Sequence, residues 1–316
     1  MKLYQINIRP SGGFYSQIKG DMLFGMFCWA IIEKFGQDRL ISCLDGYTQN
    51  RPFIVFSDAF PQGWLPKPTL PFTYYRKQKQ NDDDSALKRK DFKRKNWLPL
   101  DKIGLSTLEM TEYFNEVPHI KKSLYTSVHL DPIRHHTTGG QYSAYTTEKL
   151  SYAAEVLSIY VLIDEERIKV DEVQQLMELI GHSGYGKKAS SGNGKFEITG
   201  DILPFKFTDK PSDSYLTLAP CVPQPDVFNS DKSFYHIFVR FGKHGNQAAH
   251  SNCPFKKPVM TAETGAVFTF ALAPSADNVS FIGTGINNIS QTEPATVFQG
   301  YAPVIPLQLK EAENDK

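Results

Sequence analysis

Apolar and polar residues follow regular patterns along the first part of the chain. Residues 4–8 alternate between the two types, which is typical of a strand with one buried face. Residues 21–36 repeat apolar side chains at helical spacing, and we expect Asp21 to be the N-cap and Gly36 to end the helix. The chain therefore begins with a strand followed by an amphipathic helix.

The next periodic segments are widely separated in the sequence. Residues 53–56 predict a second strand, and the apolar run at 155–164 predicts a third that is mostly buried. Residues 171–181 place apolar side chains on one helical face, with Asp171 as the expected cap and Gly181 as the expected end. Together these segments predict two strands and then a second helix.

A fourth strand is predicted at 195–199, where apolar and polar residues alternate again. The order strand, helix, strand, strand, helix, strand is the ferredoxin-like arrangement that RRM-type RNA-binding proteins also use. Residues 201–316 contain β-prone segments separated by Pro and Gly, without a long amphipathic helix. We therefore predict an α+β protein with an N-terminal ferredoxin-like domain at 1–200 and a β-rich domain at 201–316.

An insertion of the N-terminal domain is predicted at about 66–150, because such a connection normally has only a few residues. Its first part, residues 75–97, is rich in Lys and Arg around an acidic triplet. A charge run of this kind is often merely solvated, but flexible cations gain free energy from counterion release when they meet RNA. Its second part, residues 125–145, predicts a β-hairpin that turns at Gly139 and Gly140.

The composition is that of an ordinary soluble protein, with 41% hydrophobic and 22% charged residues among 316. The formal net charge is only +1, so cations that bind nucleic acid must be concentrated locally. The four cysteines form no CxxC pair, which argues against a zinc knuckle or a disulfide framework. No apolar run approaches the roughly 20 residues of a membrane-spanning helix. We expect a cytoplasmic protein with no membrane contact.

The segment "GHSGYGKKASSGNGKFEITG" at 181–200 is rich in glycine and carries Lys187, Lys188 and Lys195. It lacks the Walker pattern, and it follows a helix and opens a strand, which is the reverse of a dinucleotide-binding loop. A mobile linker is one interpretation of it. The other is a phosphate-binding loop, and the lysines favour an extended phosphate backbone over a single nucleotide.

Histidines and an aspartate on the predicted hairpin are the nearest approach to a metal or acid–base site. His129 and Asp131 share one face, but only one of His135 and His136 could join them. We favour exposed histidines that stack or form hydrogen bonds, and expect neither a metal nor a cofactor. Asp58 is expected to have a structural role in a turn.

Several segments in order resemble one known family: "IKGDMLFGMFCWAI", "FSDAFPQGWLPKP", "GYGKKASSGNGKFE", "FKKPVMTAETGAVF" and "VFQGYAPVIPL". The chain resembles the RAMP proteins that form subunit four of type III-A (Csm) CRISPR effector complexes. The resemblance spans nearly the whole chain. The "GDxLFG" helix start and the "QGYAPVIP" ending together are specific to this subunit group.

This resemblance implies tandem ferredoxin-like (RRM-like, RAMP) domains, the second degenerate, that grip the 5′ repeat-derived handle of the guide RNA (crRNA). The implied neighbours are the large polymerase-like subunit and the first backbone RAMP subunit, and the implied role is not catalytic. The hairpin would resemble a thumb that crosses the guide where the handle meets the spacer, near paired target RNA. Arg134 would steady a phosphate there, and His135 or His136 would lie against a displaced base.

The expected RNA contacts lie in four segments, and either Tyr185 or Phe24 is expected to offer a stacking platform. The residues are Lys19, Asp21, Phe24, His129, Arg134, His135, His136, Gly184, Tyr185, Gly186, Lys187, Lys188, Ala189, Ser190, Ser191, Gly192, Asn193, Gly194, Arg240 and Lys243. The alternative function is a related repeat-processing endoribonuclease, in which His129 or His135 would act as general acid or base. The sequence has no histidine near the first helix, which favours the non-catalytic role.

Overall fold

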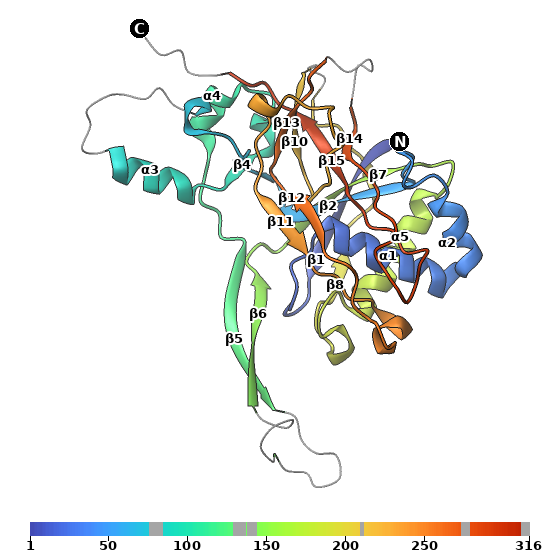
Figure 1. Ribbon diagram of the computed structural model, residues 1–316. Coiled ribbons are helices and arrows are strands. Elements are labelled where there is room, and N and C mark those ends of the chain that lie inside the picture. Colours follow the sequence, from blue (N-terminus) through green and yellow to red (C-terminus); the bar gives the residue numbers. More distant parts are fainter. Residues whose placement is uncertain (76–84, 129–136, 138–143, 209–211, 273–278, 311–316) are drawn as a thin grey trace.

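The computed structural model describes all residues except 76–84, 129–136, 138–143, 209–211, 273–278 and 311–316. The described part is mixed α+β (Figure 1), as the sequence predicts. None of its helices is long and apolar enough to cross a membrane.

An antiparallel sheet forms the centre of the N-terminal half. Its strands are β2 (Ile54–Pro61), β7 (Leu157–Ile163), β1 (Lys2–Pro10) and β8 (Phe196–Ile198), in that order, and β9 (Leu203–Pro204) also pairs with β1. The four predicted strands are therefore present, with the first and third at the centre of the sheet. This arrangement confirms the ferredoxin-like prediction for the first half of the chain.

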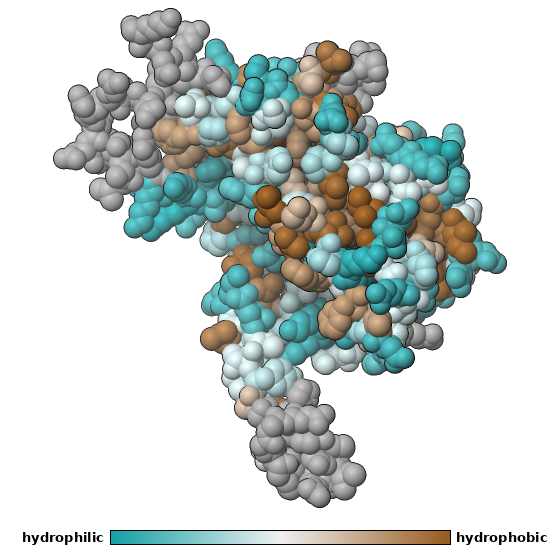
Figure 2. Space-filling view, in the orientation of Figure 1, coloured by the Kyte–Doolittle hydropathy of each residue, from teal (hydrophilic) through white to brown (hydrophobic). Residues whose placement is uncertain are grey.

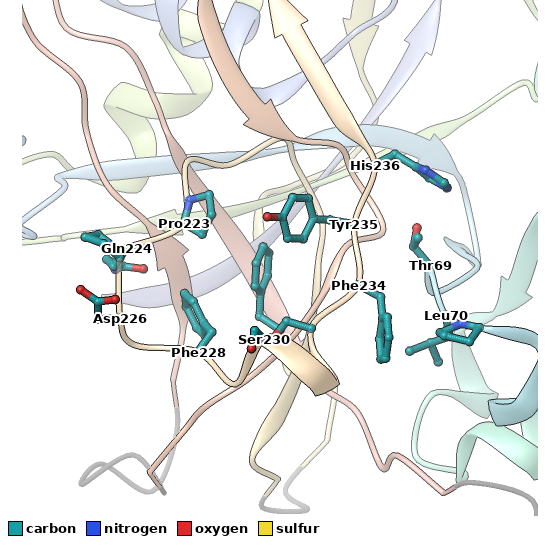
Figure 3. A pocket seen from close by; sticks show the side chains of 14 residues that line it. Thr69, Leu70, Pro223, Gln224, Asp226, Phe228, Ser230, Phe234, Tyr235 and His236 are labelled. Atoms are coloured by element: carbon teal, nitrogen blue, oxygen red, sulfur yellow. The ribbon is translucent and has the colours of Figure 1, made fainter.

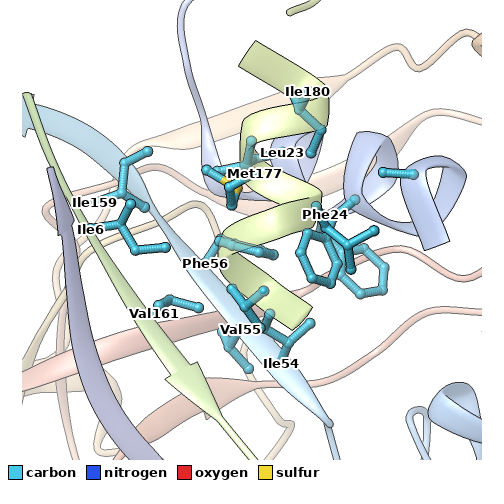
Figure 4. Packing of buried hydrophobic residues seen from close by; sticks show 14 of the residues in the cluster. Ile6, Leu23, Phe24, Ile54, Val55, Phe56, Ile159, Val161, Met177 and Ile180 are labelled. Atoms are coloured by element: carbon cyan, nitrogen blue, oxygen red, sulfur yellow. The ribbon is translucent and has the colours of Figure 1, made fainter. Parts of the chain in front are cut away.

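Helices α1 (Gly20–Phe35) and α5 (Val170–Ser183) cover one face of this sheet, and α2 (Gln37–Leu44) follows α1. Figure 4 shows Leu23, Phe24, Met177 and Ile180 of the helices packed against side chains of the strands. Every residue of β2 and β7 is buried. A single covering layer would leave alternate residues exposed, so the opposite face of these strands must also be covered.

Gly36 is the C-cap of α1, as predicted, but the caps predicted at Asp21, Asp171 and Gly181 are wrong. The residue at the N-cap of α1 is Lys19, and Asp21 lies inside the first turn, where its buried carboxylate binds Arg240. In α5 the N-cap is Lys169, and the helix continues through Gly181 to a C-cap at Gly184. A Cβ at Gly181 would lie 2.3 Å from the carbonyl oxygen of Phe196, so this glycine allows close helix–strand approach rather than ending the helix.

The C-terminal half is β-rich, as predicted. Strands β13 (Val267–Thr269), β10 (Ser214–Thr217), β15 (Tyr301–Pro306) and β14 (Phe281–Gly283) form a sheet in that order, and β11 (Ile237–Arg240) pairs with β12 (Val259–Ala262). Side chains of this half pack against the second face of the N-terminal sheet. One buried cluster contains Phe60 and Tyr160 together with Leu216 and Ile305.

The insertion contains β3 (Trp64–Pro66), α3 (Ser85–Arg94), β4 (Trp97–Pro99) and α4 (Thr107–Met110). The sequence predicted a mobile basic arm, but residues 85–94 of that arm are helical. The Lys67 ammonium lies 4.2 Å from the ring centroid of Phe92 and donates a hydrogen bond to the backbone carbonyl oxygen of Phe92. These contacts hold the end of α3 against the body of the protein.

The predicted hairpin is present and longer than expected. Its strands are β5 (Ile120–Val128) and β6 (Ala144–Tyr152), and Figure 1 shows the pair projecting away from the rest of the molecule. Only Leu150, near its base, is buried in the described part of the two strands. The predicted turn at Gly139 and Gly140 lies outside the described residues.

Candidate nucleic-acid interface

The glycine-rich loop, residues 184–195, connects α5 to β8 and has a defined conformation. Gly184 caps α5 with a φ of 94°, and its N–H donates to the carbonyl oxygen of Ile180. Gly194 has a φ of 75°, and a Cβ there would lie 2.1 Å from the carbonyl oxygen of Tyr185. These glycines are needed because the loop folds tightly on itself, so the mobile-linker interpretation does not describe this segment.

Most backbone N–H groups of the loop donate hydrogen bonds to acceptors within the protein. They are therefore not free to bind phosphates, although the many glycines suggested that they would be. Protein acceptors take the amides of Tyr185, Gly186, Lys187, Ala189, Ser191, Gly192, Asn193 and Gly194. A Cβ at Gly184, Gly186 or Gly194 would lie against protein atoms, whereas a Cβ at Gly192 would meet nothing within 4 Å. The lysine side chains are therefore the groups of this loop that can bind phosphates.

The prediction that Tyr185 or Phe24 stacks on RNA bases is wrong for this fold. Tyr185 is completely buried, and its hydroxyl donates to the carbonyl oxygen of Gln17 and accepts from the Lys19 N–H at 3.0 Å. Burial raises the pKa of Tyr185 well above its usual value. Phe24 is also buried, stacked on Tyr47 with 4.8 Å between ring centroids. Both rings belong to the core.

Lysines of the glycine-rich loop differ in their surroundings. Lys187 and Lys195 are exposed. Lys188 adopts the left-handed conformation, with a φ of 62°, and its ammonium donates to the Thr147 hydroxyl at 3.2 Å. The same ammonium lies 4.6 Å from the ring centroid of Tyr15 and 5.1 Å from that of Tyr145. Lys188 thus joins the loop to the outer half of β6 in the hairpin.

One face of the hairpin continues this arrangement. The register pairs Tyr125 with Thr147 and Ser127 with Tyr145, so these side chains lie on the face that Lys188 contacts. The Lys149 ammonium is 5.6 Å from the ring centroid of Tyr125, which is 52% exposed. We call the set Tyr15, Tyr125, Tyr145, Lys149 and Lys188 the tyrosine–lysine face. Aromatic rings alternating with lysines can stack on bases and neutralise phosphates.

Sequence reasoning missed the tyrosine–lysine face, although a signal was present. Residues 145, 147 and 149 alternate with their neighbours and therefore share one side of the strand. Tyr15 gave no such signal, because only the fold brings it to Lys188. The hairpin residues that were predicted, namely His129, Arg134, His135 and His136, lie outside the described residues.

The structure brings three of the predicted contact residues together in a different role. Asp21 accepts two hydrogen bonds from the Arg240 guanidinium, one of them at 2.8 Å, and its side chain is 1% exposed. The Lys19 ammonium lies 3.1 Å from the carboxylate of Asp58. Both cations are internally compensated, whereas Lys243 is exposed.

The electrostatics support this pairing. Burial alone would lower the pKa of Lys19, but the charge and hydrogen bond of Asp58 raise the pKa above its usual value. Asp58 also accepts hydrogen bonds from the Gly20 N–H and the Thr264 hydroxyl. It lies within β2, so the turn expected from the sequence is wrong, and it links the start of α1 to the C-terminal half. The Arg240–Asp21 pair makes a second link of the same kind.

A cavity lined mainly by residues of the C-terminal half has the wrong chemistry for a nucleic-acid backbone. It has a volume of about 740 Å³, and Figure 3 shows Phe228, Phe234, Tyr235 and His236 among its lining side chains. Its lining contains no Lys or Arg and includes Asp226. A smaller cavity of about 170 Å³ lies at the foot of the hairpin, beside Lys19 and His119. Among the described residues, no cluster of His, Cys, Asp and Glu is arranged to hold a metal ion.

The chain matches no protein-family model and no curated protein. Its fold is found in solved structures. A crystal structure of a Csm1–Csm4 cassette with pppApA aligns over 99% of this chain and 100% of the matched chain, with a TM-score of 0.60 and 15% identity. A cassette with AMPPNP aligns over 99% of this chain and 100% of the matched chain, with a TM-score of 0.59 and 16% identity. A Csm3–Csm4 subcomplex of the type III-A interference complex aligns over 96% of this chain and 99% of the matched chain, with a TM-score of 0.59 and 14% identity.

These likenesses extend along almost the whole chain, and at such low identity they show the fold. The resemblance to subunit-four RAMP proteins that the sequence suggested is confirmed at that level. The predicted α+β RAMP architecture is confirmed as well. The RNA contacts themselves stay predictions.

Proposed function

We propose that this chain is the non-catalytic subunit four of a type III-A CRISPR effector complex, which binds and caps the 5′ handle of the crRNA. The observation that carries the proposal is the junction at Lys188, where the glycine-rich loop meets the tyrosine–lysine face of the hairpin. Lysines and tyrosines alternate there from the body of the protein along the hairpin. Tyr125 is exposed, and the other members of the face are half-buried. A single-stranded RNA needs such a surface for its phosphates and its unstacked bases.

The local charge supports this assignment. The chain as a whole is nearly neutral, yet Lys187 and Lys195 are exposed on a loop that also holds Lys188. Counterion release makes each phosphate contact favourable at low salt without requiring an overall basic protein. We expect the isolated chain to bind RNA weakly and with little sequence preference, and specificity to arise in the assembled complex.

The proposed neighbours follow from the similar structures. Those structures contain Csm1 with Csm4 and Csm3 with Csm4. We therefore propose that this chain connects a large polymerase-like subunit to the first backbone subunit, and that its hairpin reaches target RNA beside the handle. The cytoplasm is the compartment in which such a complex would act.

The test is to express this chain with the other subunits of its complex and a repeat–spacer transcript, purify the assembly and sequence the bound RNA. The proposal predicts crRNAs with a common 5′ handle, and loss of handle protection from nuclease when the chain is omitted. A complex that assembles and protects the handle equally well without it would contradict the proposal.

A second assay addresses the endoribonuclease alternative. The isolated chain is incubated with repeat RNA in EDTA, and His129→Gln/His135→Gln serves as the comparison variant because these histidines would act as general acid or base in that alternative. We expect no cleavage. Products that form with the wild-type chain and disappear in the variant would assign the chain to repeat processing instead.

A further inference from the structure

Two exposed phenylalanines lie on a lobe that the proposed RNA interface does not include. The lobe, residues 240–258, runs from the end of β11 to the start of β12. Phe241 is 76% exposed and Phe255 is 70% exposed. Figure 2 shows hydrophobic residues gathered where Figure 1 places β11 and β12. Rings with this much exposure in a folded protein commonly mark a binding surface.

The two rings lie on one face of the lobe. Phe255 forms an antiparallel bridge with Lys243, and Phe241 precedes Lys243 by two positions. On extended backbone this makes the two phenylalanines diagonal neighbours, about 7–8 Å apart. The Lys243 ammonium lies 5.7 Å from the ring centroid of Phe255. The face therefore presents two rings with a cation beside them.

All Lys, Arg, Asp and Glu residues of the lobe are of the basic kind. Residues 240–258 include Arg240, Lys243, Lys256 and Lys257 but no Asp or Glu. Arg240 is neutralised by the buried carboxylate of Asp21, whereas Lys243 and Lys257 are exposed. Burial lowers the pKa of Lys256, which is only partly exposed. Exposed lysines beside exposed rings fit an anionic, aromatic ligand.

The lobe also borders the helix that the glycine-rich loop contacts. A Cβ at Gly245 would lie 3.8 Å from the ring of Trp29 on α1. One turn earlier, the sulfur of Met26 accepts a hydrogen bond from the Gly186 N–H. Positions 26 and 29 lie on the same side of a helix. One RNA strand can therefore pass from the loop to the lobe across this side of α1.

We infer that the lobe is a second contact for single-stranded RNA, in which bases stack on Phe241 and Phe255 while Lys243 and Lys257 bind phosphates. The inference rests on the proposed function and adds a site to it. A protein partner is the other candidate for an apolar face of this kind. The exposed lysines favour RNA, because lysine is depleted at the centre of protein interfaces.

The experiment measures binding of a fluorescent oligoadenylate to the full chain at several salt concentrations. Phe241→Ala/Phe255→Ala should weaken binding at least about tenfold and leave the log–log salt slope unchanged, because the rings release no counterions. Lys243→Gln/Lys257→Gln should reduce the slope by about 0.7 for each lost phosphate contact. Urea unfolding establishes that each variant is folded.

The matched control is Leu203→Ala/Leu272→Ala. These residues are 60% and 84% exposed but lie outside the β11–β12 ribbon. This variant should bind RNA like the wild type. Equal weakening in the control and the phenylalanine variant would overturn the inference, because the effect would then not depend on the rings.

Two further outcomes separate the inference from the proposed function. If Lys187→Gln/Lys188→Gln weakens binding but Phe241→Ala/Phe255→Ala does not, the inference falls and the proposed function stands. The same holds if the phenylalanine variant keeps its RNA affinity but loses a protein subunit from the assembled complex. If the wild-type chain and the assembled complex bind no RNA, both fall.

Discussion

Cations serve opposite purposes in two neighbouring regions of this molecule. At the start of α1, Lys19 and Arg240 are mostly buried and paired with carboxylates. On the glycine-rich loop, Lys187 and Lys195 are exposed, and Lys188 is held between two tyrosines. The first group joins distant segments of the chain, and the second is available to a ligand. Burial and pairing, rather than residue type, separate a structural cation from a binding one.

Removal of one buried carboxylate tests most strongly whether the buried cations are structural. Asp21→Asn leaves the mostly buried guanidinium of Arg240 without a countercharge, which should destabilise the protein by about 3–5 kcal/mol. Urea unfolding measures the change. The control is Asp45→Asn in the exposed pair with Arg51, where about 1 kcal/mol or less is expected. Similar losses in the two variants would mean that the Asp21 pair has no special structural role.

The second test uses pH. Burial lowers the pKa of His119 to about 4, and the charge of Asp58 opposes this only partly. The unfolded chain then binds more protons between pH 4 and 6.5, so stability is complete above that window and falls as pH decreases through it. The loss reaches roughly 3 kcal/mol. His119 packs edge-on against Trp97, so His119→Phe should preserve the packing and abolish this pH dependence.

Urea unfolding at several pH values tests this expectation, with His182→Gln as the control. His182 is an exposed histidine at the end of α5. The control should keep the wild-type loss of stability between pH 6.5 and 4. An unchanged profile in His119→Phe would show that another group causes the dependence.

A smaller effect is expected in the glycine-rich loop. Gly194→Ala must adopt a φ of 75° and bring its Cβ within 2.1 Å of the Tyr185 carbonyl oxygen. The left-handed conformation alone costs about 1–2 kcal/mol, and the clash adds to it. Gly192→Ala is the matched control, because its φ is 78° and a Cβ there meets nothing within 4 Å. Equal stability of the two variants would mean that the loop is loose at Gly194.

The smallest change in stability is expected from the hairpin. Replacing residues 124–148 with a short Gly-Ser turn keeps the bridge between Phe14 and Leu150, and every described side chain that it removes is exposed or half-buried. Stability should change by no more than about 0.5 kcal/mol, while guide loading or target pairing beside the handle should be impaired. Unfolding of the shortened protein, or normal loading and pairing, would contradict the proposed role of the hairpin.

Local patterns were sufficient to predict the four strands and two helices of the N-terminal sheet, because the strands alternate or are continuously apolar and the helices repeat apolar residues at helical spacing. They predicted the C-cap of α1 at Gly36 but not the other caps. Asp21 has the residue type of an N-cap, but its carboxylate is held by Arg240, more than 200 residues away. Gly181 has the residue type of a helix end, but it serves close contact with β8. Contacts between residues far apart in the sequence therefore determine the roles of both residues.

The same limit applied to the site. The glycine-rich loop and its lysines could be found from composition alone. Whether a tyrosine faces RNA or the core depends on packing. Tyr185 was therefore predicted to stack on RNA, although its ring lies in the core. Tyr15 was overlooked because its partner Lys188 is remote in the sequence. The fold placed both rings in ways that local sequence does not encode.

The central claim is that Lys187 and Lys188 of the glycine-rich loop bind RNA phosphates. Its most direct test is the salt dependence of RNA affinity for the wild-type chain and for Lys187→Gln/Lys188→Gln. The log–log slope should fall by about 0.7 for each lysine lost, as for single strands. The control, Lys34→Gln/Lys169→Gln, removes the same charge at the opposite ends of α1 and α5 and should keep the wild-type slope. An unchanged slope in the loop variant, or an equal fall in the control, would contradict the claim.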